Sequence, residues 1–124
     1  MDSKQQLINA VNNIAEEITS PELINKMDYC PEDWDELTQE EQDEYEVTAS
    51  DYLHDALDLV HIIRHASNEH IGSEICVTFG GPNIYINTRT NCVEGYWGGD
   101  KVERNFTDNL GLDEYCEELY NCYK

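Results

Sequence analysis

The stretch SEICVTFGGPNIYINTRTNCVEGYWGGDKVERNF, residues 73–106, decides the fold class because its hydrophobicity alternates with a period of two residues. The alternation runs through EICVTF, NIYINT, CVEGYW and KVERNF, and short turns rich in glycine and asparagine separate these runs. The pattern predicts a four-stranded antiparallel meander that begins after Gly72. The expected apolar face comprises Ile75, Val77, Phe79, Ile84, Ile86, Val93, Trp97, Val102 and Phe106. The expected opposite face carries Tyr85, Asn87, Glu94, Tyr96 and Glu103.

Outside this stretch, the chain predicts helices. Apolar residues recur at helical spacing over residues 3–19, which predicts an amphipathic helix. Ser20-Pro21-Glu22 has the residue types of a helix start, so a short second helix is expected to about Met27. Thr38-Gln39-Glu40-Glu41 has the spacing of a capping box, which predicts another helix beginning at Thr38. An apolar stripe after Gly111 predicts the last helix.

The stretch SDYLHDALDLVHIIRHAS, residues 50–67, predicts a central helix. Its apolar residues cover a broad arc when they are placed on a helix, so this helix is expected to contact more than one neighbour. Residues 47–50 form a plausible break before it, with Ser50 as the cap.

Helices followed by a meander predict an α+β fold, in which N-terminal helices pack with a four-stranded antiparallel meander and a C-terminal helix. The 124 residues suit a single domain over residues 1–124. In this prediction, residues 1–71 form a helical, acidic half. Residues 72–124 form the sheet and the C-terminal helix.

The strong negative charge of the chain indicates which classes of partner it can bind. Asp and Glu number 27 against 7 Lys and Arg, for a formal net charge of −20. Such a field repels nucleic acids and anionic membranes, whose phosphates are also negative. We therefore expect no direct binding of nucleic acid or membrane, and attraction to basic protein surfaces.

The five cysteines are odd in number, widely spaced and without a C-x-x-C pair. A secreted disulfide scaffold normally has an even count in a smaller chain. The N-terminus lacks the apolar core of a signal peptide, and no apolar run reaches membrane-spanning length. These features predict reduced thiols and a cytoplasmic location.

The most acidic stretch is PEDWDELTQEEQDEYE, residues 31–46, with nine carboxylates and no Lys or Arg. The whole interval between Lys26 and Arg64 contains no Lys or Arg. An ordinary solvated helix places Lys among its acidic residues, which offsets the repulsion between their carboxylates. We therefore interpret the stretch as a partner-binding surface, with a merely solvated face as the alternative. Trp34 and Tyr45 are expected either to anchor a partner or to pin the segment to the core. The predicted partner-binding residues are Glu32, Asp33, Asp35, Glu36, Glu40, Glu41, Asp43, Glu44, Glu46, Asp51 and Asp55.

A second constellation contains histidines. If residues 50–67 were helical, His54, Asp58, His61 and His65 would lie along one stripe opposite the apolar arc. Such a stripe could ligate zinc or respond to pH, because His and carboxylate groups at helical spacing can share a metal ion. The H-E-x-x-H pattern and the EF-hand loop are both absent, so we predict no metal site and no cofactor.

Enzyme motifs are also missing. The chain has no phosphate-binding loop, no dinucleotide fingerprint and no nucleophile elbow. We predict that the protein is not an enzyme and assign no catalytic residues.

The stretches EDWDELTQEEQDEYE and SDYLHDALD resemble the small acidic inhibitors of host defence that phages and mobile elements carry, of the anti-CRISPR and anti-restriction type. To a lesser degree, GGPNIYINTRTNCVEGYWGGDK resembles hairpins in phage-type proteins. Many members of that group are DNA mimics that occupy a basic channel meant for nucleic acid. The resemblance covers about a quarter of the chain, is compositional, and implies no catalytic residues. The basic residues Arg89, Lys101 and Arg104 lie in the sheet half, so the partner face is expected on the helical half.

Together these features predict a non-enzymatic acidic inhibitor that occupies a basic nucleic-acid-binding groove of a CRISPR-type defence complex, in the bacterial cytoplasm. One alternative is an immunity or antitoxin protein that neutralises a basic nuclease. A further alternative is a metal-binding enzyme or sensor that uses the histidine stripe.

Overall fold

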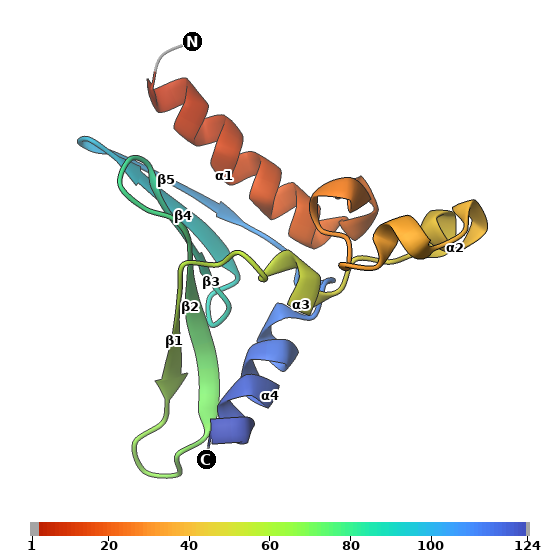
Figure 1. Ribbon diagram of the computed structural model, residues 1–124. Coiled ribbons are helices and arrows are strands. Elements are labelled where there is room, and N and C mark those ends of the chain that lie inside the picture. Colours follow the sequence, from red (N-terminus) through yellow and green to blue (C-terminus); the bar gives the residue numbers. More distant parts are fainter. Residues whose placement is uncertain (1–2, 124) are drawn as a thin grey trace.

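The computed structural model describes residues 3–123 (Figure 1). The helices are α1 (Ser3–Thr19), α2 (Gln39–Glu44), α3 (Ala49–Tyr52) and α4 (Leu112–Tyr123). Short 3₁₀ turns are η1 (Pro21–Leu23), η2 (Lys26–Asp28) and η3 (Trp34–Glu36). The strands are β1 (Asp58–Ile63), β2 (His70–Thr78), β3 (Asn83–Asn87), β4 (Cys92–Trp97) and β5 (Asp100–Asn105).

The strands form one antiparallel sheet in the order β1-β2-β3-β4-β5. Each strand pairs with its neighbour in the chain, as expected for a meander of short connections. The helices lie on one side of this sheet, with α1 over β4 and β5 and α4 over β2 (Figure 1). Within residues 3–123, no helix covers the opposite face, which we call the open face.

The α+β class and the sheet between residues 74 and 105 are confirmed. Tyr85, Glu94 and Glu103 are aligned across β3, β4 and β5, so they share the open face as predicted. Ile75, Ile86 and Val93 are aligned in the same way on the helix-covered face and are buried. Phe79 is an exception: it lies beyond the end of β2 with 72% of its surface exposed, so its assignment to the core is wrong.

The central helix predicted for residues 50–67 is wrong. Helix α3 ends at Tyr52, and residues 58–63 form β1, which raises the sheet to five strands in the part of the chain described here. Short apolar runs such as LVHII fit a strand as well as a helix, and pairing with β2 decides between them. The cap of α3 is Thr48 rather than Ser50. The sheet therefore begins at Asp58, and the predicted helical half extended too far.

The other helices agree with the sequence patterns, with one change. Helix α1, the capping box at Thr38 and helix α4 are found where they were predicted. The short helix expected after Ser20 is divided into η1 and η2, because the chain extends at Ile24 and Asn25.

All five cysteines are free in the structure. Among residues 3–123, no helix combines the length and the apolar character needed to cross a membrane. Three of the cysteines are buried, and burial raises the pKa of the Cys116 thiol to about 11, which keeps it protonated at neutral pH.

The centre of the core is the contact between α1 and the middle of the sheet. Leu7 and Val11 are fully buried and point at Gly95 in β4. A Cβ atom at Gly95 would lie 2.6 Å from Val11 Cγ2 and 2.7 Å from Leu7 Cδ1. The absence of a side chain at this position is therefore what lets α1 approach the sheet so closely.

We predict that Gly95→Ala destabilises the fold by about 1–3 kcal/mol, because the added methyl group overpacks a filled core. Chemical denaturation followed by circular dichroism measures this change. Gly99→Ala is the matched control, since a Cβ atom there meets nothing within 4 Å. Equal stability of the two variants would contradict the close packing of α1 on β4.

Candidate interaction surface

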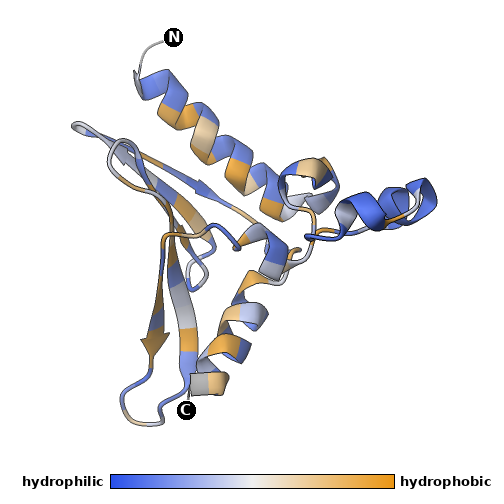
Figure 2. Cartoon of the chain, in the orientation of Figure 1, coloured by the Kyte–Doolittle hydropathy of each residue, from blue (hydrophilic) through white to orange (hydrophobic). Residues whose placement is uncertain are grey.

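The acidic segment, defined as residues 31–46, projects from the molecule beyond the C-terminal end of α1 (Figure 1). Its helix α2 is hydrophilic all round in Figure 2. All nine of its carboxylates are exposed: Glu32, Asp33, Asp35, Glu36, Glu40, Glu41, Asp43, Glu44 and Glu46. Asp55 is exposed outside the segment, whereas Asp51 is half-buried. Six of the nine lie on η3 and the six-residue α2, and Glu32, Asp33 and Glu46 lie in the adjoining stretches, so the carboxylates do not share one long helix.

Local hydrogen bonds fold the acidic segment. Glu41 N donates to Thr38 Oγ1 over 3.1 Å, and Thr38 N donates to Glu41 Oε1 over 3.3 Å, which completes a capping box at the start of α2. Thr48 and Asp51 form the same arrangement at α3. In each box a carboxylate oxygen accepts a hydrogen bond from a backbone N–H group. No positively charged group takes part, so the carboxylates keep their negative charge.

An aromatic pair supports the segment from inside. The rings of Trp34 and Tyr45 meet edge to face with centroids 5.7 Å apart, and Trp34 is only 7% exposed. Gln42 Nε2 donates to Trp34 O over 2.8 Å, which ties α2 to η3. Trp34 is thus buried within the segment itself and is not part of the main hydrophobic core, so the expected pinning of the segment to the core is not found for Trp34.

Tyr45 connects the acidic segment to α3. Its hydroxyl donates to Asp51 Oδ2 over 2.6 Å. This hydrogen bond to a carboxylate raises the pKa of Tyr45 to about 12. Burial opposes ionisation of Asp51, but hydrogen bonds from Thr48 and Tyr45 outweigh it and lower the pKa of Asp51. Asp51, predicted to bind a partner, therefore has a structural role as well.

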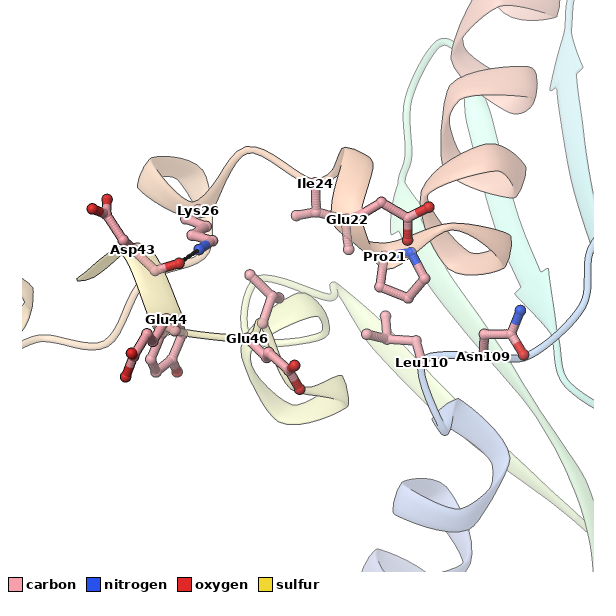
Figure 3. Close-up of a pocket in the computed structure, with 11 residues that line it drawn as sticks. Pro21, Glu22, Ile24, Lys26, Asp43, Glu44, Glu46, Asn109 and Leu110 are labelled. Atoms are coloured by element: carbon pink, nitrogen blue, oxygen red, sulfur yellow. Dashed lines mark hydrogen bonds between the residues drawn. The ribbon is translucent and has the colours of Figure 1, made fainter. Parts of the chain in front are cut away.

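Lys26 is the cation that reaches the acidic segment, and it binds backbone rather than carboxylates. Its Nζ donates to the carbonyl oxygen of Asp43 over 2.7 Å (Figure 3). It also donates to the carbonyl oxygen of Gln42 over 3.3 Å. These carbonyls end α2, where the helix dipole places partial negative charge. Lys26 therefore fixes the end of α2 and leaves the carboxylates of the segment unpaired.

The ion pairs of the chain lie elsewhere. Across residues 3–123, Lys and Arg side chains form ion pairs at Arg64–Glu69 (3.6 Å) and Lys101–Glu103 (2.6 Å) and nowhere in the acidic segment. Lys26 brings one positive charge to the end of α2, but within residues 3–123 no Lys or Arg forms an ion pair with a carboxylate of the segment.

A groove of about 780 Å³ runs between the acidic segment, η1 and the loop before α4 (Figure 3). Carboxylates of Glu22, Asp43, Glu44 and Glu46 line it together with Ile24, Val47 and Leu110, and Lys26 of the same chain also lines it. The groove therefore already contains a cationic side chain with an aliphatic stem, the kind of group that acidic and apolar side chains together favour.

The predicted histidine stripe does not form. His54 is exposed after α3, Asp58 begins β1, and His65 is exposed in the turn after β1. His61 instead points to residues that the sequence patterns did not indicate: Ser73 Oγ lies 3.1 Å from His61 Nδ1 and 2.8 Å from His70 Nε2. Between Ser3 and Tyr123, no group of three or more His, Cys, Asp or Glu is arranged to hold a metal ion.

The cluster around Ser73 lies between β1, β2 and α4. The ring centroid of His61 is 5.3 Å from that of His70 and 5.6 Å from that of Tyr120. Ser73 is fully buried, and its hydroxyl lies within hydrogen-bond distance of both imidazole rings. No sequence pattern indicated this cluster, because its members meet only once residues 58–63 pair as a strand.

Comparison with known proteins gives no match to the chain, whether against family models, curated proteins or solved structures. The functional argument therefore rests on the surface itself. Its strongest feature is the ordered, unpaired negative charge of the acidic segment.

We predict that the stability of the fold decreases as the pH falls below about 6.5, partly because of His61. Burial and the neighbouring His70 lower the pKa of His61 below its ordinary value of 6.5. As the pH falls, His61 therefore binds a proton in the unfolded chain at a higher pH than in the folded chain. Protonation of His61 consequently favours the unfolded state. His61→Gln should reduce the loss of Tm between pH 7.5 and pH 5.5.

His54→Gln is the control, because His54 is exposed and forms no part of the cluster. It should keep the pH dependence of the wild type. Identical pH dependence in all three proteins would show that His61 is not perturbed.

Proposed function

We propose that this protein is a non-enzymatic inhibitor whose acidic segment binds the basic nucleic-acid-binding groove of a defence complex, of which a CRISPR-type complex is our first choice. The observation that carries the proposal is that nine exposed carboxylates lie on an ordered segment in which no Lys or Arg pairs with them, as judged over residues 3–123. Such a surface attracts the same Lys and Arg side chains that normally hold phosphates.

The order of the segment supports a binding role over a solvated tail. Capping boxes, the Trp34–Tyr45 pair and the Lys26 hydrogen bonds fix the backbone that carries the carboxylates before any partner arrives. A preorganised surface loses less conformational entropy on association than a flexible one. An acidic tail used only for solubility would need none of these interactions.

In the mechanism we propose, long-range attraction guides the acidic segment toward a basic groove and raises the association rate. Carboxylates then replace nucleic-acid phosphates as partners of the groove, and the counterions of both surfaces are released. Inhibition follows from occupancy alone, since the nucleic acid cannot enter the filled groove. No bond is made or broken in this scheme.

Of the two alternatives considered from the sequence, the immunity protein is compatible with the same surface and the metal-binding enzyme is not proposed. An immunity protein that neutralises a basic nuclease would use the same surface, so the identity of the captured partner decides between the two proposals. The metal-binding enzyme relied on a helical histidine stripe, and its residues lie on a strand and two turns instead. We do not propose it.

The direct test is capture of partners from a bacterial lysate on the immobilised protein, with elution by short duplex DNA. An RNA- or DNA-handling complex that DNA elutes, and whose target binding the protein blocks, would support the proposal. A single small basic nuclease would support the immunity function instead. If DNA elutes nothing, the idea of a shared groove is wrong.

For a captured complex, we predict that the triple variant Glu36→Gln, Glu40→Gln, Glu44→Gln weakens binding by roughly tenfold or more at low salt. These side chains are exposed and lie outside the capping boxes, so the fold should be retained. Titration by fluorescence anisotropy measures the change.

The matched control removes the same charge from α4, through Glu114→Gln, Glu117→Gln and Glu118→Gln, which are also exposed. This control should bind within about twofold of the wild type, because it changes only the long-range attraction to the partner and leaves the acidic segment intact. Equal weakening by both triples would mean that net charge, and not the acidic segment, governs binding.

A further inference from the structure

The strand β1 forms one edge of the sheet. Over residues 3–123, β1 pairs with β2 on one side and with no strand on the other. The N–H and C=O groups on that outer side are therefore available to another strand. Asp58 and Val60 are exposed, and the other four residues of β1 are half-buried.

The two edges of the sheet differ in how they are protected. β5, with the sequence DKVERN, carries the exposed charged residues Lys101, Glu103 and Arg104. Charged side chains on an edge strand commonly prevent it from pairing with a strand of another molecule. From Leu59 to Ile63, β1 has no Lys, Pro or acidic residue, and Val60 is 52% exposed. Leu57, directly before the strand, is 62% exposed. Figure 2 shows the hydrophobic character of β1 along this edge.

The charges at the ends of β1 indicate which partner would fit. Asp58 begins the strand, and Arg64 follows its last residue and forms an exposed ion pair with Glu69 of its own chain; both side chains are exposed. If a second β1 ran antiparallel with His61 opposite His61, Asp58 would lie opposite Arg64 at both ends. Val60 would lie opposite Ile62 on the open face, which is an apolar cross-strand pair. The strand is thus complementary to itself in one register.

We propose that β1 pairs with β1 of a second copy of this chain in this antiparallel register, which joins two sheets across a two-fold axis. An interface of this kind is self-complementary, as two-fold symmetry requires. The pairing of β1 with β2 is irregular between Ile62 and Ile63, where β2 has the extra residue Ile71; the Val60–Ile62 pair lies before this point and the Asp58–Arg64 pair beyond it. This inference is independent of the proposed inhibitory function.

The shape of the molecule makes such a dimer compatible with its charge. Two chains of net charge −20 repel each other. Figure 1 places β1 at one side of the molecule and α2 at the other, so pairing through β1 keeps the two acidic segments far apart. At about 150 mM salt the Debye length is about 8 Å, which screens their repulsion but leaves groups in contact able to interact.

Sedimentation equilibrium of the full chain between about 5 and 300 µM, in about 150 mM NaCl, tests the proposal. We expect a monomer–dimer equilibrium within this range. Val60→Lys should raise the dissociation constant at least roughly tenfold, because two like charges then enter one interface. Asn105→Lys adds the same charge to the exposed end of β5 and should leave the constant unchanged. A wild type that stays monomeric, or equal effects of the two variants, would overturn the proposal.

The register has its own test. Asp58→Arg should weaken the dimer, because the new Arg lies opposite Arg64 of the second copy. Adding Arg64→Asp to this variant should restore the dimer, since the opposite charges then face each other in exchanged positions. Circular dichroism checks that each variant is folded. A double variant that stays as weak as Asp58→Arg would exclude antiparallel self-pairing through β1, even if the wild type is dimeric.

Discussion

The packing of Leu7 and Val11 on the backbone of Gly95 is the contact on which the rest of the molecule depends. It sets the position of α1 on the sheet, and α1 leads directly into the turns that carry the acidic segment. The end of α1 is fastened a second time, because Thr107 N donates to Thr19 Oγ1 over 3.1 Å and Asn109 Nδ2 donates to Thr19 O over 2.7 Å. The acidic segment therefore leaves the core from a fixed base.

The acidic segment is stabilised by hydrogen bonds and aromatic packing instead of ion pairs, and this distinction matters for function. An ion pair with Lys or Arg would stabilise the segment only modestly, because both groups would be exposed, and would reduce its attraction to a basic partner. The capping boxes fix the backbone without adding positive charge, and Lys26 binds the carbonyls of Gln42 and Asp43 without forming an ion pair with a carboxylate. The surface is thus both ordered and strongly negative.

Features decided by local sequence could be predicted, and features decided by distant pairing could not. The four runs after residue 73, α1, α4 and the Thr38 capping box depend on periodicity and local hydrogen bonds. β1 was mistaken for a helix because its state depends on pairing with β2, and the histidine stripe failed with it. The Ser73 cluster depends on that pairing too. The composition of the acidic segment was evident from the sequence. Its hydrogen bonds with Lys26 could not be predicted, because they join residues 16 and 17 positions apart and no local pattern indicates them.

The central claim is that the acidic segment carries charge which the rest of the protein does not neutralise. The most direct test is the Tm of the wild type in NaCl from about 10 to 300 mM, where screening shortens the Debye length from about 30 Å to below about 8 Å. Unpaired carboxylates repel one another, so the account predicts that Tm rises with salt, and that the rise is smaller when Glu36, Glu40 and Glu44 are changed to Gln. A Tm that stays flat or falls would mean that the carboxylates are neutralised within the protein, and would contradict the account.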